Sequence, residues 1–181
     1  MLSEADRAVL DESFQNTRMA GEAIHMVIGK VEDEDLALDL NRQACRFLQF
    51  EEKLQQMYAR EHETPPRDHV VDKTMLWGGI QMNTLMDDST EKLADMMIQG
   101  NTKGMTELMK TVKENRTAAR EYCEIAKEIA DFEEKNIEKL KAYLKKDRLV
   151  ISDIFWYNQE RMAAVKRDLP PSKKGLHICY V

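Results

Sequence analysis

The stretch LADMMIQGNTKGMTELMKTVKEN, residues 93–115, followed by EIAKEIADFEEKNIEKLKAYL, residues 124–144, decides the fold of this chain. Apolar and small side chains recur in it at intervals of three and four residues, which places them along one side of a helix. The first stripe is Leu93, Met97, Gly100, Gly104, Leu108 and Val112, and the second is Ala118, Tyr122, Ile125, Ile129, Phe132, Leu140 and Tyr143. Two helices are therefore predicted, the second ending near residue 146.

The junction of these two helices allows two interpretations. The spacing runs almost unbroken through residues 114–117, so a single helix over 89–146, roughly 85 Å long, is the competing interpretation. We favour a turn, with Asn115 as a left-handed C-cap and Thr117 as the next N-cap. Upstream, Asp88 followed by Glu91 has the spacing of a capping box.

The N-terminal part of the chain predicts a second helical hairpin. Apolar stripes indicate one helix from Ser3 to about Lys30 and another ending near Glu63, and the acidic link 32–34 is short enough to make them antiparallel neighbours. Pro65 and Pro66 end the second helix. The sequence thus predicts an all-α antiparallel four-helix bundle with one long crossover between its second and third helices, covering residues 1–146. Residues 147–181 are expected to form a C-terminal appendage.

Composition narrows the classes of function. The formal net charge of -6 argues against a protein that binds nucleic acid by neutralising phosphates. No apolar run reaches the length of a membrane span, and the start MLSEADRAVLDE lacks the basic region of a signal peptide, so we expect a cytoplasmic protein. Cys45, Cys123 and Cys179 are widely spaced and are expected to be free thiols.

The order of hairpin, crossover and hairpin, together with the two quoted stretches, resembles small uncharacterised bacterial proteins of the ferritin-like superfamily. The resemblance covers roughly residues 3–146. In metal-active members of that superfamily, inward carboxylates on two helices join Glu-x-x-His motifs on the other two. The resemblance therefore implies an iron or manganese site in the core.

Three residues are candidates for such a site. A helical wheel places Glu51 in the apolar stripe of the second helix, and Glu133 and Asn136 in that of the fourth. Glu51, Glu133 and Asn136 are the candidate metal ligands. Leu54 and Asn136 occupy the two positions where the family pattern has histidine, so an intact di-iron site is not expected.

Two interpretations of Glu51 and Glu133 remain open. If the two carboxyls face each other in the core, they repel, and one has a raised pKa and shares a proton. In the alternative, each is hydrogen-bonded to Tyr58, Tyr122 or Asn136, or lies near a helix end and is more exposed than the helical wheel suggests.

Other motifs have structural interpretations. Glu22 and His25 have the Glu-x-x-His spacing but fall on a polar face, where a surface role is expected. Methionines 96, 97, 105 and 109 are expected to be core or a partner surface rather than metal ligands.

The sequence favours a non-catalytic, self-associating or binding module with a degenerate metal site, forming a homo-oligomer, most simply a dimer, through Met-rich and aromatic surfaces. The alternative is an oxidant-handling or storage protein that binds iron or manganese, in which case any enzyme activity is that of a metal-dependent oxidoreductase. A third hypothesis places a small ligand in an apolar pocket lined by the crossover and the tail.

Overall fold

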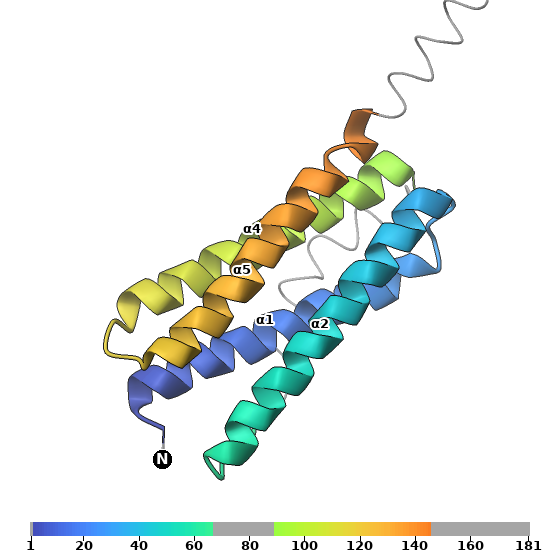
Figure 1. The fold of residues 1–181 in the computed structure, drawn as a ribbon. Coiled ribbons are helices and arrows are strands. Elements are labelled where there is room, and N and C mark those ends of the chain that lie inside the picture. The colour runs from blue at the N-terminus through green and yellow to red at the C-terminus, as the bar shows by residue number, and fades with distance from the viewer. Residues whose placement is uncertain (1, 67–88, 146–181) are drawn as a thin grey trace, which may run out of the picture. The chain divides into compact units, whose positions relative to one another are not determined.

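The computed structural model describes residues 2–66 and 89–145. They form the α-helices α1 (Glu4–Ile28), α2 (Glu34–Arg60), α4 (Thr90–Glu114) and α5 (Arg120–Leu140), followed by a short 3₁₀ helix, Tyr143–Lys145 (Figure 1). The described part of the chain contains no strand, which confirms the prediction of an all-α protein with four helices. None of the described helices is long and apolar enough to cross a membrane.

Two predicted regions lie outside the described residues. They are most of the connection between α2 and α4, residues 67–88, and the C-terminal appendage, residues 147–181.

Polar side chains begin three of the helices. Ser3 and the helical residue Asp6 form a capping box at α1, and the side chain of Asp33 accepts a hydrogen bond from the backbone of α2. At α4 the cap is Ser89, whose hydroxyl accepts from the backbone N–H of Lys92 at 3.3 Å. The predicted capping box starting at Asp88 is therefore wrong by one residue.

A turn separates α4 from α5, so the single long helix is excluded. Asn115 is the C-cap, but its φ of -106° is not left-handed, because its side-chain Nδ2 donates to the carbonyl of Thr111 at 2.9 Å within ordinary backbone geometry. The N-cap of α5 is Ala119 rather than Thr117, and Ala119 has no side chain that can cap. Instead, its backbone N–H donates to Oδ1 of Asp6 at 2.6 Å.

The directions of the helices follow from contacts at their ends. Tyr143, after α5, donates to Asp39 near the start of α2 at 2.8 Å, whereas Tyr122, near the start of α5, donates to Glu61 after α2 at 3.3 Å. These contacts make α2 and α5 antiparallel. Since α4 and α5 form an antiparallel hairpin, α2 and α4 run in the same direction (Figure 1).

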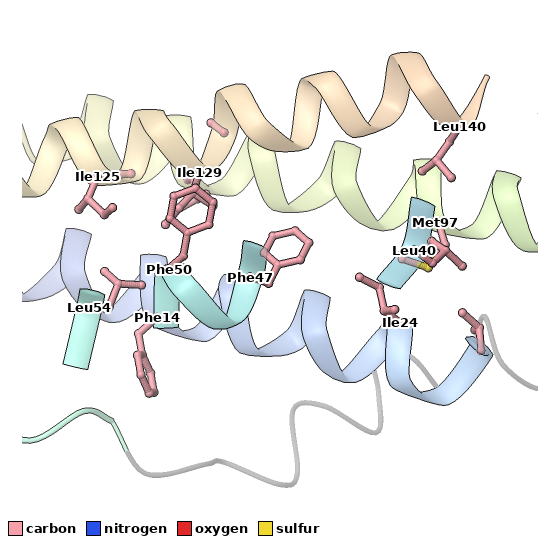
Figure 2. Packing of buried hydrophobic residues seen from close by; sticks show 14 of the residues in the cluster. Phe14, Ile24, Leu40, Phe47, Phe50, Leu54, Met97, Ile125, Ile129 and Leu140 are labelled. Atoms are coloured by element: carbon pink, nitrogen blue, oxygen red, sulfur yellow. The ribbon is translucent and has the colours of Figure 1, made fainter. Parts of the chain in front are cut away.

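All four helices contribute to one apolar core. Ile24, Leu40, Met97 and Leu140, one from each helix, gather at one end of the core (Figure 2). Towards the other end, the ring of Phe132 packs edge-on against Phe47 and Phe50, with centroids 5.2 and 5.7 Å away. The interior is thus a packed hydrophobic core, and the polar side chains inside it are exceptions.

Candidate functional site

Among the described residues, seven polar side chains lie buried in the helical interior. They are Ser13, Asn16, Thr17, Gln43, Asn101, Glu133 and Asn136. Because burying a polar group is costly unless it is hydrogen-bonded, each of these side chains should have a hydrogen-bond partner or a functional role. Four of them, Asn16, Asn101, Glu133 and Asn136, are linked in two pairs across α1, α4 and α5, and we call these four the buried polar cluster.

Glu133 is the only carboxyl among the fully buried residues described, with 1% of its surface exposed. Nδ2 of Asn16 donates to both of its oxygens, at 3.1 Å each. Burial raises the pKa of Glu133 to about 8, against a smaller lowering by the Asn16 hydrogen bond. The Glu133 carboxyl is therefore mainly protonated at neutral pH, and its predicted inward position is confirmed.

Gly104 on α4 makes room for this pair. A Cβ at position 104 would lie 2.5 Å from Oε1 of Glu133 and closer still to Oδ1 of Asn16. Atoms cannot approach so closely, so any side chain here would displace one member of the pair. The absence of a side chain at Gly104 thus admits a polar pair from two other helices.

The second pair lies one helical turn away. Nδ2 of Asn136 donates to Oδ1 of Asn101 at 3.4 Å, and Nδ2 of Asn101 donates to the carbonyl of Met97 at 2.7 Å. Asn136 follows Glu133 by three residues on α5, and Asn101 precedes Gly104 by three on α4, so the two pairs are stacked along the helices. Asn136 was correctly placed inside by its spacing.

Glu51 does not join the cluster. Its side chain is 25% exposed, accepts a hydrogen bond from Gln55 at 3.2 Å and lies 3.9 Å from Nε of Arg18 on α1. The predicted core position is wrong, because α2 directs Phe50 and Leu54 inwards and Glu51 is rotated by about 100° from Phe50 towards the edge shared with α1.

Glu51 and Glu133 therefore do not form a carboxylate pair, and burial rather than Glu51 raises the pKa of Glu133. The alternative is confirmed for Glu51 in its greater exposure, but the predicted hydrogen-bond partners of the two carboxyls were wrong. The hydroxyl of Tyr58 donates to Asp11 at 2.5 Å, and Tyr122 donates to Glu61.

The predicted surface position of Glu22 and His25 and the core position of two of the methionines are confirmed. Glu22 and His25 are both exposed on α1. Met96 and Met97 belong to the core, whereas Met109 is 42% exposed. The methionines of α4 therefore do not form one continuous surface.

The polar cluster does not suit iron or manganese. It offers one carboxyl and three side-chain amides, whereas a redox metal pair is held by several carboxylates and imidazoles. Within residues 2–66 and 89–145 there is no group of three or more His, Cys, Asp or Glu side chains that could hold a metal ion.

Three of the buried polar residues, Ser13, Asn16 and Gln43, were not predicted from the sequence. Asn16 was overlooked because only acids were sought on the first helix. Gln43 lies three residues after Leu40 and four before Phe47, a spacing that marks it as interior. The amide of Gln43 and the hydroxyl of Thr17 have no hydrogen-bond partner among the described residues.

Comparison of the chain with protein-family models, with curated proteins and with solved structures gives no match. A proposal for its function therefore rests on the side chains described above.

Proposed function

We propose that this chain is a ferritin-like four-helix-bundle protein that acts as a non-catalytic, self-associating module. The observation that carries the proposal is the pairing inside the core, where Glu133 is bound by Asn16 and Asn136 by Asn101. Groups that would be metal ligands in a ferritin-like enzyme are replaced by amides that bind one another.

The helix directions support the ferritin-like part of the proposal. Since α2 and α4 run in the same direction, the end of α2 and the start of α4 lie at opposite ends of the bundle. A single long crossover between two antiparallel hairpins distinguishes ferritin-like bundles from simple up-and-down bundles.

The chemistry of the core supports the non-catalytic part. A mainly protonated carboxyl is a poor ligand for a hard cation, because binding would require the proton to be lost in an apolar environment. The amide of Asn16 is hydrogen-bonded to that carboxyl. The amide of Asn101 is hydrogen-bonded to Asn136 and to a carbonyl of its own helix. These groups stabilise one another and leave few donor atoms for a metal.

The surface of α2 supports self-association. Leu48 is 60% exposed and Leu38 50%, both on this helix. Leu48 lies at a groove of about 380 Å³ between α1 and α2, whose apolar lining includes Ile24, Ile28 and Ala44. A two-fold axis beside α2 would bring the Leu48 side chain of each copy against the same patch of the other. The interface is therefore proposed on α2 rather than on the methionines of α4.

Sedimentation velocity across the micromolar range tests the proposed dimer. We expect the unmodified protein to be a dimer and Leu48→Glu to be a monomer of unchanged helical content, because a carboxylate at the apolar contact would be desolvated. Met109→Glu, on α4, is the matched control and should remain a dimer. A monomeric unmodified protein, or equal effects of the two substitutions, would refute self-association through α2.

Elemental analysis tests the non-catalytic part separately. After purification from medium supplemented with iron and manganese, we expect far less than one metal ion per chain. A stoichiometric metal that is lost in Glu133→Gln would overturn this part of the proposal and favour the metal-binding alternative.

A further inference from the structure

The hydrogen bonds between Asn16 and Glu133 come from a single nitrogen. Nδ2 of Asn16 donates to both carboxyl oxygens, at 3.1 Å each, whereas Oδ1 of Asn16 accepts no hydrogen bond from any described residue. This arrangement suits an ionised carboxylate, which has only acceptor sites. A protonated carboxyl also has an O–H group, which needs an acceptor of its own. The observed arrangement provides no acceptor for that proton.

Oδ1 of Asn16 is well placed to become that acceptor. A Cβ at position 104 would lie within 2.5 Å of both Oδ1 of Asn16 and Oε1 of Glu133, so these two oxygens face the same point of α4 and lie within about 5 Å of each other. A rotation of the amide about the Cβ–Cγ bond of Asn16 brings Oδ1 towards the carboxyl while Nδ2 stays bonded to its other oxygen. An acid and a primary amide arranged in this way form two separate hydrogen bonds, one in each direction.

The surroundings of Glu133 contain no charge that balances an ionised carboxylate. Burial raises its pKa and the Asn16 hydrogen bond lowers it, and no charged group of the described chain contributes. On α1 and α4 the carboxyl meets neutral groups, the Asn16 amide and a glycine backbone. On α2, Arg46 and Lys53 both pair with Glu128 instead. Because a buried carboxylate without a counter-ion is costly, the folded protein favours the protonated carboxyl.

We propose that Asn16 and Glu133 form a pH-dependent switch, in which the Asn16 amide turns when the Glu133 carboxyl gains or loses its proton. With the proton present, the carboxyl O–H donates to Oδ1 and Nδ2 donates to the second carboxyl oxygen, so two hydrogen bonds join α1 to α5. When the proton passes to water, Nδ2 is the one remaining donor of the pair, and an unbalanced negative charge is left in the core. Loss of the proton therefore weakens the contact of α1 with α5. The switch does not depend on self-association through α2.

Side-chain NMR of the full chain from pH 4 to pH 10 tests the rotation. The carboxyl carbon of Glu133 and the side-chain amide of Asn16 should titrate together, with one midpoint near pH 8. The neighbouring pair of Asn101 and Asn136 is the control, and its amide signals should shift much less. A Glu133 carboxyl that titrates while the Asn16 amide stays unchanged would overturn the switch, as would a carboxyl that titrates near the ordinary 4.5.

The variant Glu133→Gln tests whether the proton causes the rotation. The glutamine amide donates to Oδ1 of Asn16 and accepts from Nδ2, so it holds the pair in the arrangement of the protonated acid at every pH. The Asn16 amide signals should therefore lose their titration near pH 8. Glu134→Gln, an exposed neighbour on α5, is the matched control and should keep it. A titration of Asn16 that persists in Glu133→Gln would refute the switch, and if this variant does not fold, the titration of the unmodified protein decides.

Backbone hydrogen exchange tests the effect on packing. At amides of α1 around Asn16, the exchange rate of the unmodified protein relative to Glu133→Gln should rise about tenfold or more between pH 6 and pH 8, because opening lets the carboxyl lose its proton to water. A ratio that does not change with pH would refute the coupling of the proton to the α1–α5 contact.

Discussion

Replacing Glu133 by glutamine should make the protein more stable at neutral and alkaline pH. The substitution keeps the shape of the side chain and an acceptor oxygen for Nδ2 of Asn16, but it removes the ionisable group. Burial raises the pKa of Glu133 in the folded protein to about 8, whereas in the unfolded chain the pKa is close to the ordinary 4.5. The folded state therefore holds a proton that the unfolded state releases over this interval.

The sign of the effect follows from this difference. A carboxyl with a raised folded-state pKa contributes its full stability below pH 4.5, and this contribution is lost as the pH rises towards 8. Between pH 5 and pH 8 the free energy of unfolding should fall by about 3–4 kcal/mol through Glu133 alone. For a chain of this length, such a change corresponds to a fall in melting temperature of about 10 °C.

Urea denaturation followed by circular dichroism at half-unit steps from pH 5 to pH 8.5 measures the effect. The difference in free energy of unfolding between Glu133→Gln and the unmodified protein should grow in favour of the variant as the pH rises. Glu134→Gln is the matched control, because Glu134 is the neighbouring residue of α5 and is exposed. This substitution should preserve the pH dependence of the unmodified protein.

A difference between Glu133→Gln and the unmodified protein that stays constant from pH 5 to pH 8.5 would refute the reasoning. Such a result would mean that Glu133 ionises in the folded state with an ordinary pKa, and hence that water or a cation reaches it.

Three further substitutions test other contacts by chemical denaturation. Gly104→Ala should destabilise the protein by about 1–2 kcal/mol despite the higher helix propensity of alanine, because the new methyl group would overlap the buried polar pair. Its control is Gly21→Ala, whose methyl group meets nothing within 4 Å and which should stabilise the protein by up to about 1 kcal/mol. Equal effects of the two substitutions would contradict the crowding at Gly104. Tyr58→Phe should cost about 1.5–3 kcal/mol by removing the hydrogen bond to Asp11, and a neutral result would show that this bond does not form in solution. Ser89→Ala should cost about 1 kcal/mol through the lost cap of α4, and an unchanged urea midpoint would argue against that cap.

Much of the fold follows from local sequence patterns. Helical spacing located four helices and placed Glu133 and Asn136 inside, since a residue's position on a helix is fixed by its neighbours three and four residues away. Glu51 was misplaced because the width of a buried stripe depends on which neighbouring helices cover it, and α1 covers only one edge of α2 near this residue. Spacing alone does not contain that information.

The interior hydrogen bonds were harder to predict. Asn16 and Glu133 are 117 residues apart, and nothing near either residue indicates the other. Asn115 was expected to be left-handed because Asn often ends helices in that way, but its own side chain supplied a hydrogen bond that made the special geometry unnecessary. Patterns identify which residues are inside, whereas their partners depend on how the helices pack.

The hydrogen bond from the backbone of Ala119 to Asp6 couples the start of α5 to the first turn of α1. The first turn of α5 has no cap of its own and takes one from a residue 113 positions earlier. In an excised α4–α5 hairpin the first turn of α5 would therefore fray, and docking of α1 would stop the fraying. Deleting residues 1–6 should accelerate amide hydrogen exchange at residues 120–122, far along the chain, before it affects the middle of α1. Unfolding should accordingly be cooperative across the four helices rather than proceed hairpin by hairpin.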